Sequence, residues 1–101
     1  MTRELLELAA KAAGIEGEHW TIPDGTWVFY EPRRANWNPL TDDGDALRLA
    51  VKLRFSVSVE PNYNFVVTED AQEIVERGED AYAATRRAIV RAAAEIGRTI
   101  Q

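Results

Sequence analysis

The chain has 101 residues, of which 46% are hydrophobic and 29% are charged, values typical of one globular domain. It contains no cysteine, which excludes disulfides, thiolate metal sites and cysteine nucleophiles. The net charge of −5 argues against nonspecific binding to nucleic acid, which depends on many cationic side chains. No apolar run approaches the ~20 residues of a membrane span, and charges interrupt the N-terminal segment too often for a signal peptide. We therefore expect a cytoplasmic protein.

The first predicted element is a helix over residues 3–13, because apolar residues recur there at helical spacing. Thr2 precedes it as an N-cap, and Gly14 is placed to adopt the left-handed conformation that ends a helix. Residues 15–25 are predicted to be a loop. A short strand is expected over 26–30, where aromatic and β-branched residues follow one another.

The second predicted helix runs from about Thr41 to Leu53, after an irregular segment over 33–38. Three aspartates crowd its first turn, where negative charge suits the helix dipole. Its buried stripe is formed by Ala46, Leu49, Ala50 and Leu53, with Leu47 and Val51 flanking it.

Residues 54–60 alternate strictly, which predicts a half-solvated antiparallel strand with Phe55, Val57 and Val59 on one face. Residues 65–68 return as a hairpin, and 71–77 are interpreted as a third strand rather than a helical turn. An alanine-rich helix is predicted over 81–97, with Asp80 as its N-cap and Gly97 at its end. The predicted fold is one α+β domain over residues 1–101. Its antiparallel sheet of three or four strands is sandwiched with helices in the order α-(β)-α-β-β-(β)-α.

The run Trp37-Asn38-Pro39-Leu40-Thr41-Asp42, followed by a helix ending at Lys52-Leu53, resembles the phage "ABA sandwich domain" family of small bacteriophage and prophage proteins. The tail GEDAYAATRRAIVRAAAEIG resembles the closing helix of that family. The resemblance covers residues 37–97 and implies a short sheet between two helices, in a protein of a bacterial host's cytoplasm. Leu40 departs from the small hydroxyl residue that such proteins often carry. The family implies no catalytic residues.

The order of helix, three strands and helix also resembles a double-stranded-RNA-binding domain. Such domains begin their last helix with lysines that meet phosphates across the RNA groove. This helix begins at Glu79-Asp80, which would repel phosphate. We therefore do not expect binding to double-stranded nucleic acid.

Four other features of the sequence have simpler structural interpretations. Asp42, Asp43 and Asp45 lack the spacing of a calcium loop, so we assign them to the helix start. His19 is the single histidine, and no nucleophile motif accompanies it. The acidic residues Glu69, Asp70, Glu73 and Glu76 are interpreted as a solvated edge, and Arg86, Arg87 and Arg91 as a solvated helix face. We predict no catalytic residue, metal or cofactor.

The candidate binding residues are Trp27, Tyr30, Arg33, Arg34 and Trp37, which fall within eleven positions. Arginine forks bind phosphate and aromatic faces stack bases, so this segment could hold a nucleotide or a peptide. The structural alternative is that the two tryptophans cover the edge of the core.

The expected function is that of a non-enzymatic phage or prophage accessory protein of uncharacterised role that acts by binding, for which a protein partner is possible. The sheet edges also allow self-association. The alternative function is binding or sequestering a small ligand, such as a nucleotide, through the segment from Trp27 to Trp37.

Overall fold

The computed structural model describes residues 2–15, 18–21, 27–31, 34–62, 64–67 and 73–100. Within these ranges the chain forms three helices and six strands. They are α1 (Thr2–Ala13), β1 (Glu18–Thr21), β2 (Trp27–Glu31), β3 (Arg34–Trp37), α2 (Asp43–Lys52), β4 (Ser56–Val59), β5 (Asn64–Val67), β6 (Glu73–Glu76) and α3 (Ala81–Thr99).

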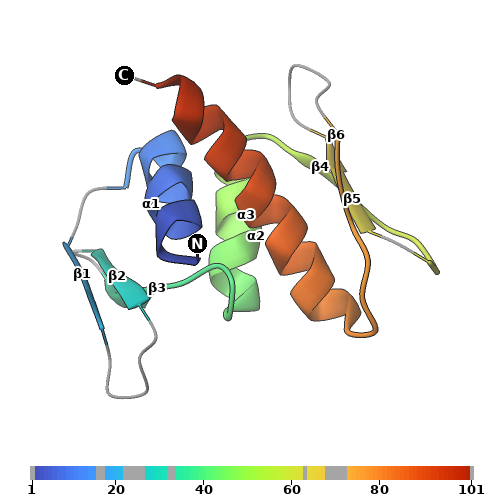
Figure 1. Ribbon diagram of the computed structural model, residues 1–101, viewed down its shortest axis with the longest axis horizontal. Helices are drawn as coiled ribbons and strands as arrows, with labels where there is room; N and C mark the ends of the chain where they lie inside the picture. The colour runs from blue at the N-terminus through green and yellow to red at the C-terminus, as the bar shows by residue number, and fades with distance from the viewer. Residues whose placement is uncertain are drawn as a thin grey trace.

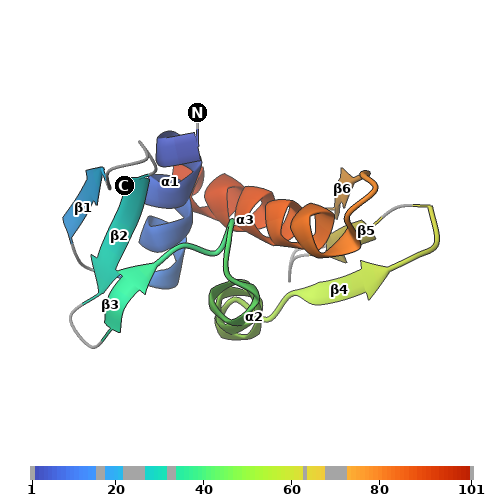
Figure 2. The same cartoon turned by 90° about the horizontal axis from the view of Figure 1, so that it is seen from below.

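The long helix α3 lies at the centre of the fold (Figure 1). Helix α1 packs along one side of it, with α2 also in contact, while the sheet β4-β5-β6 packs against its other side. A second sheet, β1-β2-β3, lies beyond α1. Figure 2 shows α2 and β4 on the same side of α3. The helices therefore form the middle of the molecule, and a sheet lies at either end.

The α+β class is as predicted, but the arrangement of the strands is not. The described strands form two antiparallel three-stranded sheets, instead of one sheet of three or four strands sandwiched with helices. Strand β2 pairs with β1 and β3, which are its neighbours along the chain. Pairing with close neighbours closes short loops at a small entropic cost, whereas joining the later sheet would span all of α2. Strands β1 and β3 replace what was predicted as loop and irregular structure.

The core consists largely of small side chains between the helices. Alanines of α1 and α3 face one another, which brings the two helices close together, so α1 rather than a sheet is the main partner of α3. Gly97 lies inside α3, not at its end as predicted, and is buried against the backbone of Leu8. The core residues are Leu6, Ala9, Ala10, Ala13, Trp37, Ala46, Leu49, Ala50, Ala88, Ile89, Val90, Ala92 and Ala93.

Helices α1 and α2 end in turns of the same hydrogen-bonded type. Gly14 follows α1 at φ 69°, as predicted, and the Ile15 amide donates to the Ala10 carbonyl at 2.9 Å. Arg54 follows α2 at φ 59°, and the Phe55 amide donates to the Ala50 carbonyl at 2.9 Å. Arg54 is therefore the left-handed residue that follows the C-cap Leu53 and ends α2, and the strand predicted from position 54 begins at Ser56.

The sheet β4-β5-β6 is regular, and its register places Val57 opposite Val66 and Val66 opposite Ile74. The strand interpretation of 71–77 is confirmed for residues 73–76. Helix α3 packs mainly on β5 and β6 and touches β4 less. Part of the inner face of β4 is consequently left uncovered.

Candidate functional site: an apolar groove between α2 and β4

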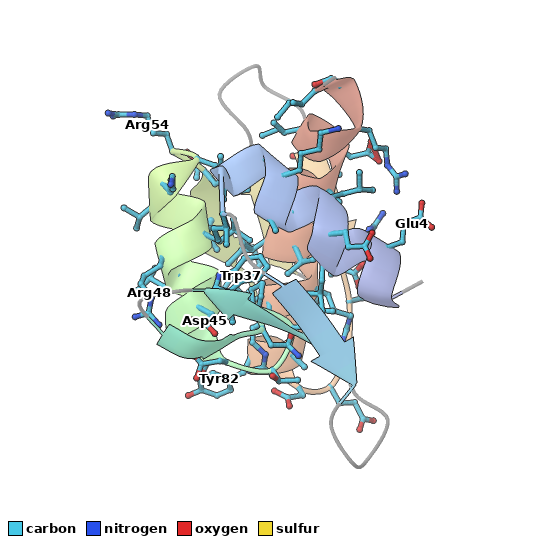
Figure 3. All side chains as sticks on the ribbon, turned by 90° about the vertical axis from the view of Figure 1, so that its left-hand side faces the viewer. Glu4, Trp37, Asp45, Arg48, Arg54 and Tyr82 are labelled. Atoms are coloured by element: carbon cyan, nitrogen blue, oxygen red, sulfur yellow. The ribbon has the colours of Figure 1, made fainter. Side chains whose placement is uncertain are left out.

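The sequence-predicted binding residues lie mainly on one hairpin. Trp27 and Tyr30 belong to β2, while Arg34 and Trp37 belong to the neighbouring strand β3. Arg33 lies outside the described residues. Trp37 is only 2% exposed and belongs to the central core, as Figure 3 shows. It therefore offers no open face for a nucleotide base, and the core alternative describes its position.

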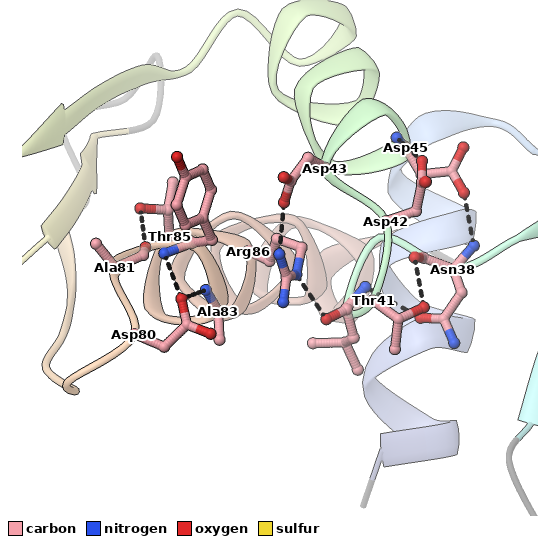
Figure 4. Close-up of polar contacts among 12 residues, drawn as sticks. Asn38, Thr41, Asp42, Asp43, Asp45, Asp80, Ala81, Ala83, Thr85 and Arg86 are labelled. Atoms are coloured by element: carbon pink, nitrogen blue, oxygen red, sulfur yellow. Dashed lines mark hydrogen bonds and ion pairs between the residues drawn. The ribbon is translucent and has the colours of Figure 1, made fainter.

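The run from Asn38 to Asp42 forms a turn that starts α2 (Figure 4). The side-chain oxygen of Asn38 accepts a hydrogen bond from the Leu40 amide at 3.0 Å. The backbone carbonyl of Asn38 accepts from the amides of Thr41 and Asp42. The Asp42 carboxylate then accepts from the Asp45 amide at 2.8 Å, which makes Asp42 the N-cap. Because of this cap, the helix begins at residue 43 and not at 41.

The other two aspartates of the first turn also have structural partners. Asp45 is 3% exposed, and its carboxylate accepts from the Asn38 amide and from the Arg48 guanidinium, each at 2.9 Å. Asp43 pairs with Arg86 of α3. Within the described residues, no group of three or more ligating side chains could hold a metal ion.

The arginines predicted to form a solvated face of α3 also join separate elements: Arg86 is mostly buried, whereas Arg87 and Arg91 are partly exposed. Arg86 donates to the Leu40 carbonyl at 2.9 Å, which connects α3 to the turn before α2. Arg87 and Arg91 both pair with Glu76 of β6. Their contacts tie α3 to α2 on one side and to the sheet on the other.

Glu76 is correspondingly not a fully solvated acid. Burial alone would raise the pKa of its carboxyl group, but hydrogen bonds and positive charge from Arg91 and Arg87 outweigh burial and hold the pKa below 4.5. Of the other acidic residues predicted at this edge, Glu73 is exposed, whereas Glu69 and Asp70 lie outside the described residues. The backbone of His19 lies on β1.

A concave surface lies where α3 leaves β4 uncovered, and we call it the α2–β4 groove. Its volume is about 530 Å³. Its apolar walls come from three elements: Ala46 and Leu47 of α2, Val57 and Val59 of β4, and Tyr82 and Ile89 of α3.

The groove is open and strongly apolar. Leu47, Val59 and Tyr82 are 62%, 59% and 71% exposed, while Ile89 is buried. Val51 follows Leu47 by one helical turn and is also exposed, so the apolar surface continues along α2. Polar groups lie at its margin, where Asp43 meets Arg86 and the Thr85 hydroxyl donates to the Ala81 carbonyl. Such a surface can receive apolar side chains.

Sequence reasoning did not predict this groove. The alternation of residues 54–60 did place Val57 and Val59 on one face, and Leu47 and Val51 were predicted to flank the buried stripe of α2. The missing information was that α3 contacts β4 less than it contacts β5 and β6, which leaves part of this face open.

Comparisons of the chain with protein-family models, with curated proteins and with solved structures found no match. In the part of the chain that the structure describes, no helix is both long enough and apolar enough to cross a membrane.

Proposed function

We propose that the protein is a non-enzymatic accessory protein that acts by binding another protein chain through the α2–β4 groove. The observation that carries this proposal is the exposure of Leu47, Val59 and Tyr82 around one concavity. Contiguous exposed apolar patches are unusual on monomeric proteins and commonly mark interaction sites. Burying these side chains contributes roughly 25 cal/mol per Å² of apolar surface, which gives binding its driving force.

A protein chain suits this surface better than a small molecule does. Small-molecule sites enclose most of their ligand, typically 70–90% of its surface. Leu47 of α2 and Tyr82 of α3 both line the groove and stand largely in solvent, so a small molecule bound there would remain largely exposed to water. A partner chain can cover both side chains at once. This supports a protein partner over nucleotide binding.

The experiment is titration of dilute protein with the apolar dye ANS, followed by fluorescence. We expect the folded protein to bind the dye and Leu47→Lys or Val59→Lys to weaken binding at least tenfold. Ile100→Lys is the matched control, because Ile100 is an exposed apolar residue outside the groove. Near-UV circular dichroism establishes that each variant is folded, since partly unfolded states also bind this dye. Equal dye binding by all variants would overturn the proposal.

We further propose a phage or prophage origin, which rests on the resemblance of residues 37–97 alone. Its test is separate from that of the groove. Transcription of the gene should rise with that of neighbouring phage genes when a prophage is induced, and constant transcription would count against this origin.

A further inference from the structure

Strand β4 is an edge of the sheet β4-β5-β6, and although it is short, it lacks the charges, prolines and bulges that commonly protect an edge. Its sequence is Ser56-Val57-Ser58-Val59, with neither charge nor proline, and its pairing with β5 has no bulge. Proteins commonly protect exposed edges with charged residues, prolines or bulges. The edge of β4 is therefore ready to pair with another strand.

The opposite edge of the same sheet differs in this respect. Strand β6 carries Glu73 and Glu76, and Arg91 of α3 donates to the Val75 carbonyl at 3.3 Å. Charge and a side-chain contact thus protect β6. The contrast makes β4 the edge at which this sheet can grow.

The same strand forms one wall of the α2–β4 groove. A strand added beyond β4 would run about 4.8 Å from it, on the open side of the sheet. Alternate side chains of the added strand would lie on the face of Val57 and Val59 and approach Leu47. One strand could thus pair with the edge backbone and cover the groove.

The sequence of β4 is complementary to itself in an antiparallel arrangement. If two copies pair about a two-fold axis at Ser58, Val57 of each copy stands opposite Val59 of the other. All four valines then share one face, because side chains alternate along a strand. Arg54 precedes the strand and Glu60 follows it, so each end of the antiparallel pair carries Arg54 of one copy and Glu60 of the other, two positions apart in register.

We propose that the partner at the groove is a second copy of this chain, joined through antiparallel pairing of the two β4 strands. The β4-β5-β6 sheet of one copy and the same sheet of the other copy then form one continuous sheet of six strands. This inference rests on the proposed function, because it names the partner for the same groove. Four residues pair on each copy, so we expect a dimer that dissociates on dilution.

The test is sedimentation equilibrium over a wide range of protein concentration. The wild-type mass should rise from 11.4 kDa toward twice that value. Ser58→Lys places like charges opposite each other across the two-fold axis and should keep the chain monomeric. Ser58→Glu should do the same, whereas an equimolar mixture of the two variants should restore the dimer.

Thr99→Lys is the matched control, because it makes a similar change at an exposed position on α3 and should leave the dimer intact. A wild-type mass of 11.4 kDa at every concentration would overturn this inference. So would a dimer that both Ser58 variants retain. The ANS titration separates the two proposals: Ser58→Lys leaves the groove wall intact and should still bind the dye. If the wild-type chain stays monomeric but still binds the dye, the proposed function of the groove is retained and its partner is a different protein.

Discussion

Gly97 of α3 lies so close to Leu8 of α1 that a β-carbon at position 97 would stand 2.0 Å from the Leu8 carbonyl oxygen. The backbone of α1 cannot move away without opening the core. We therefore expect Gly97→Ala to lower the free energy of unfolding by about 3 kcal/mol, measured by urea denaturation.

Gly44→Ala is the matched control for this substitution. The three atoms nearest to an added β-carbon there are side-chain ends of Arg48 and Asp42, at 3.1–3.3 Å. Its stability should stay within about 1 kcal/mol of the wild type. A Gly97→Ala variant as stable as this control would contradict the close packing of α1 on α3.

Asp45 is expected to stabilise the start of α2 more than its neighbour Asp43 does. Asp45→Ala leaves the Asn38 amide without its carboxylate acceptor and should cost about 2 kcal/mol in thermal or urea unfolding. Asp43→Ala removes a pair whose carboxylate is 62% exposed, and should cost roughly 0–1 kcal/mol. Equal losses would contradict a structural role for the buried carboxylate.

Arg54 holds a left-handed conformation that glycine adopts without steric cost. We expect Arg54→Gly to raise the free energy of unfolding by about 1 kcal/mol. Arg54→Ala is the control, because it removes the same charged side chain but keeps the β-carbon. A melting temperature no higher for the glycine variant than for the alanine variant would show that position 54 carries no such strain.

Glu76 should make stability depend on acid pH. Its pKa is lowered in the folded chain, so the unfolded chain binds the proton first as the pH falls. The stabilisation is therefore present above pH 4.5 and is lost as the pH falls through the lowered folded-state pKa.

We expect Glu76→Gln to cost about 1 kcal/mol at neutral pH, and the difference from wild type to shrink in acid. Thermal melts at several pH values measure this, with the exposed Glu73→Gln on the same strand as the control. A difference that persists unchanged into strong acid would rule out the charge of Glu76 as its cause.

Local chemistry made several helix ends predictable from the sequence. Gly14 and Asp80 were identified because glycine tolerates positive φ and a short carboxylate side chain caps amides. Arg54 was assigned to a strand because arginine gives no sign of a left-handed cap. Gly97 was wrongly predicted to end α3, because its role is close packing against Leu8 rather than helix termination.

The arrangement of elements that lie far apart in the sequence was harder to predict. The strand patterns did not show that the strands divide into two sheets, because pairing partners are chosen by tertiary contacts. The groove could not be predicted from the sequence for a related reason. Val57 and Val59 alternate as a buried face would, and only the position of α3 reveals that the face is open.

The alanine-rich contact between α1 and α3 has an evolutionary consequence. Ala9, Ala92 and Ala93 are fully buried, so larger side chains there would force the two helices apart. Only glycine is smaller than alanine, which leaves few substitutions in either direction that keep the two helices in place. The exposed walls around Leu47 and Val59 face no such constraint. Over generations the helix pair should change slowly while the surface beside it diverges, so new partners can be acquired without rebuilding the core.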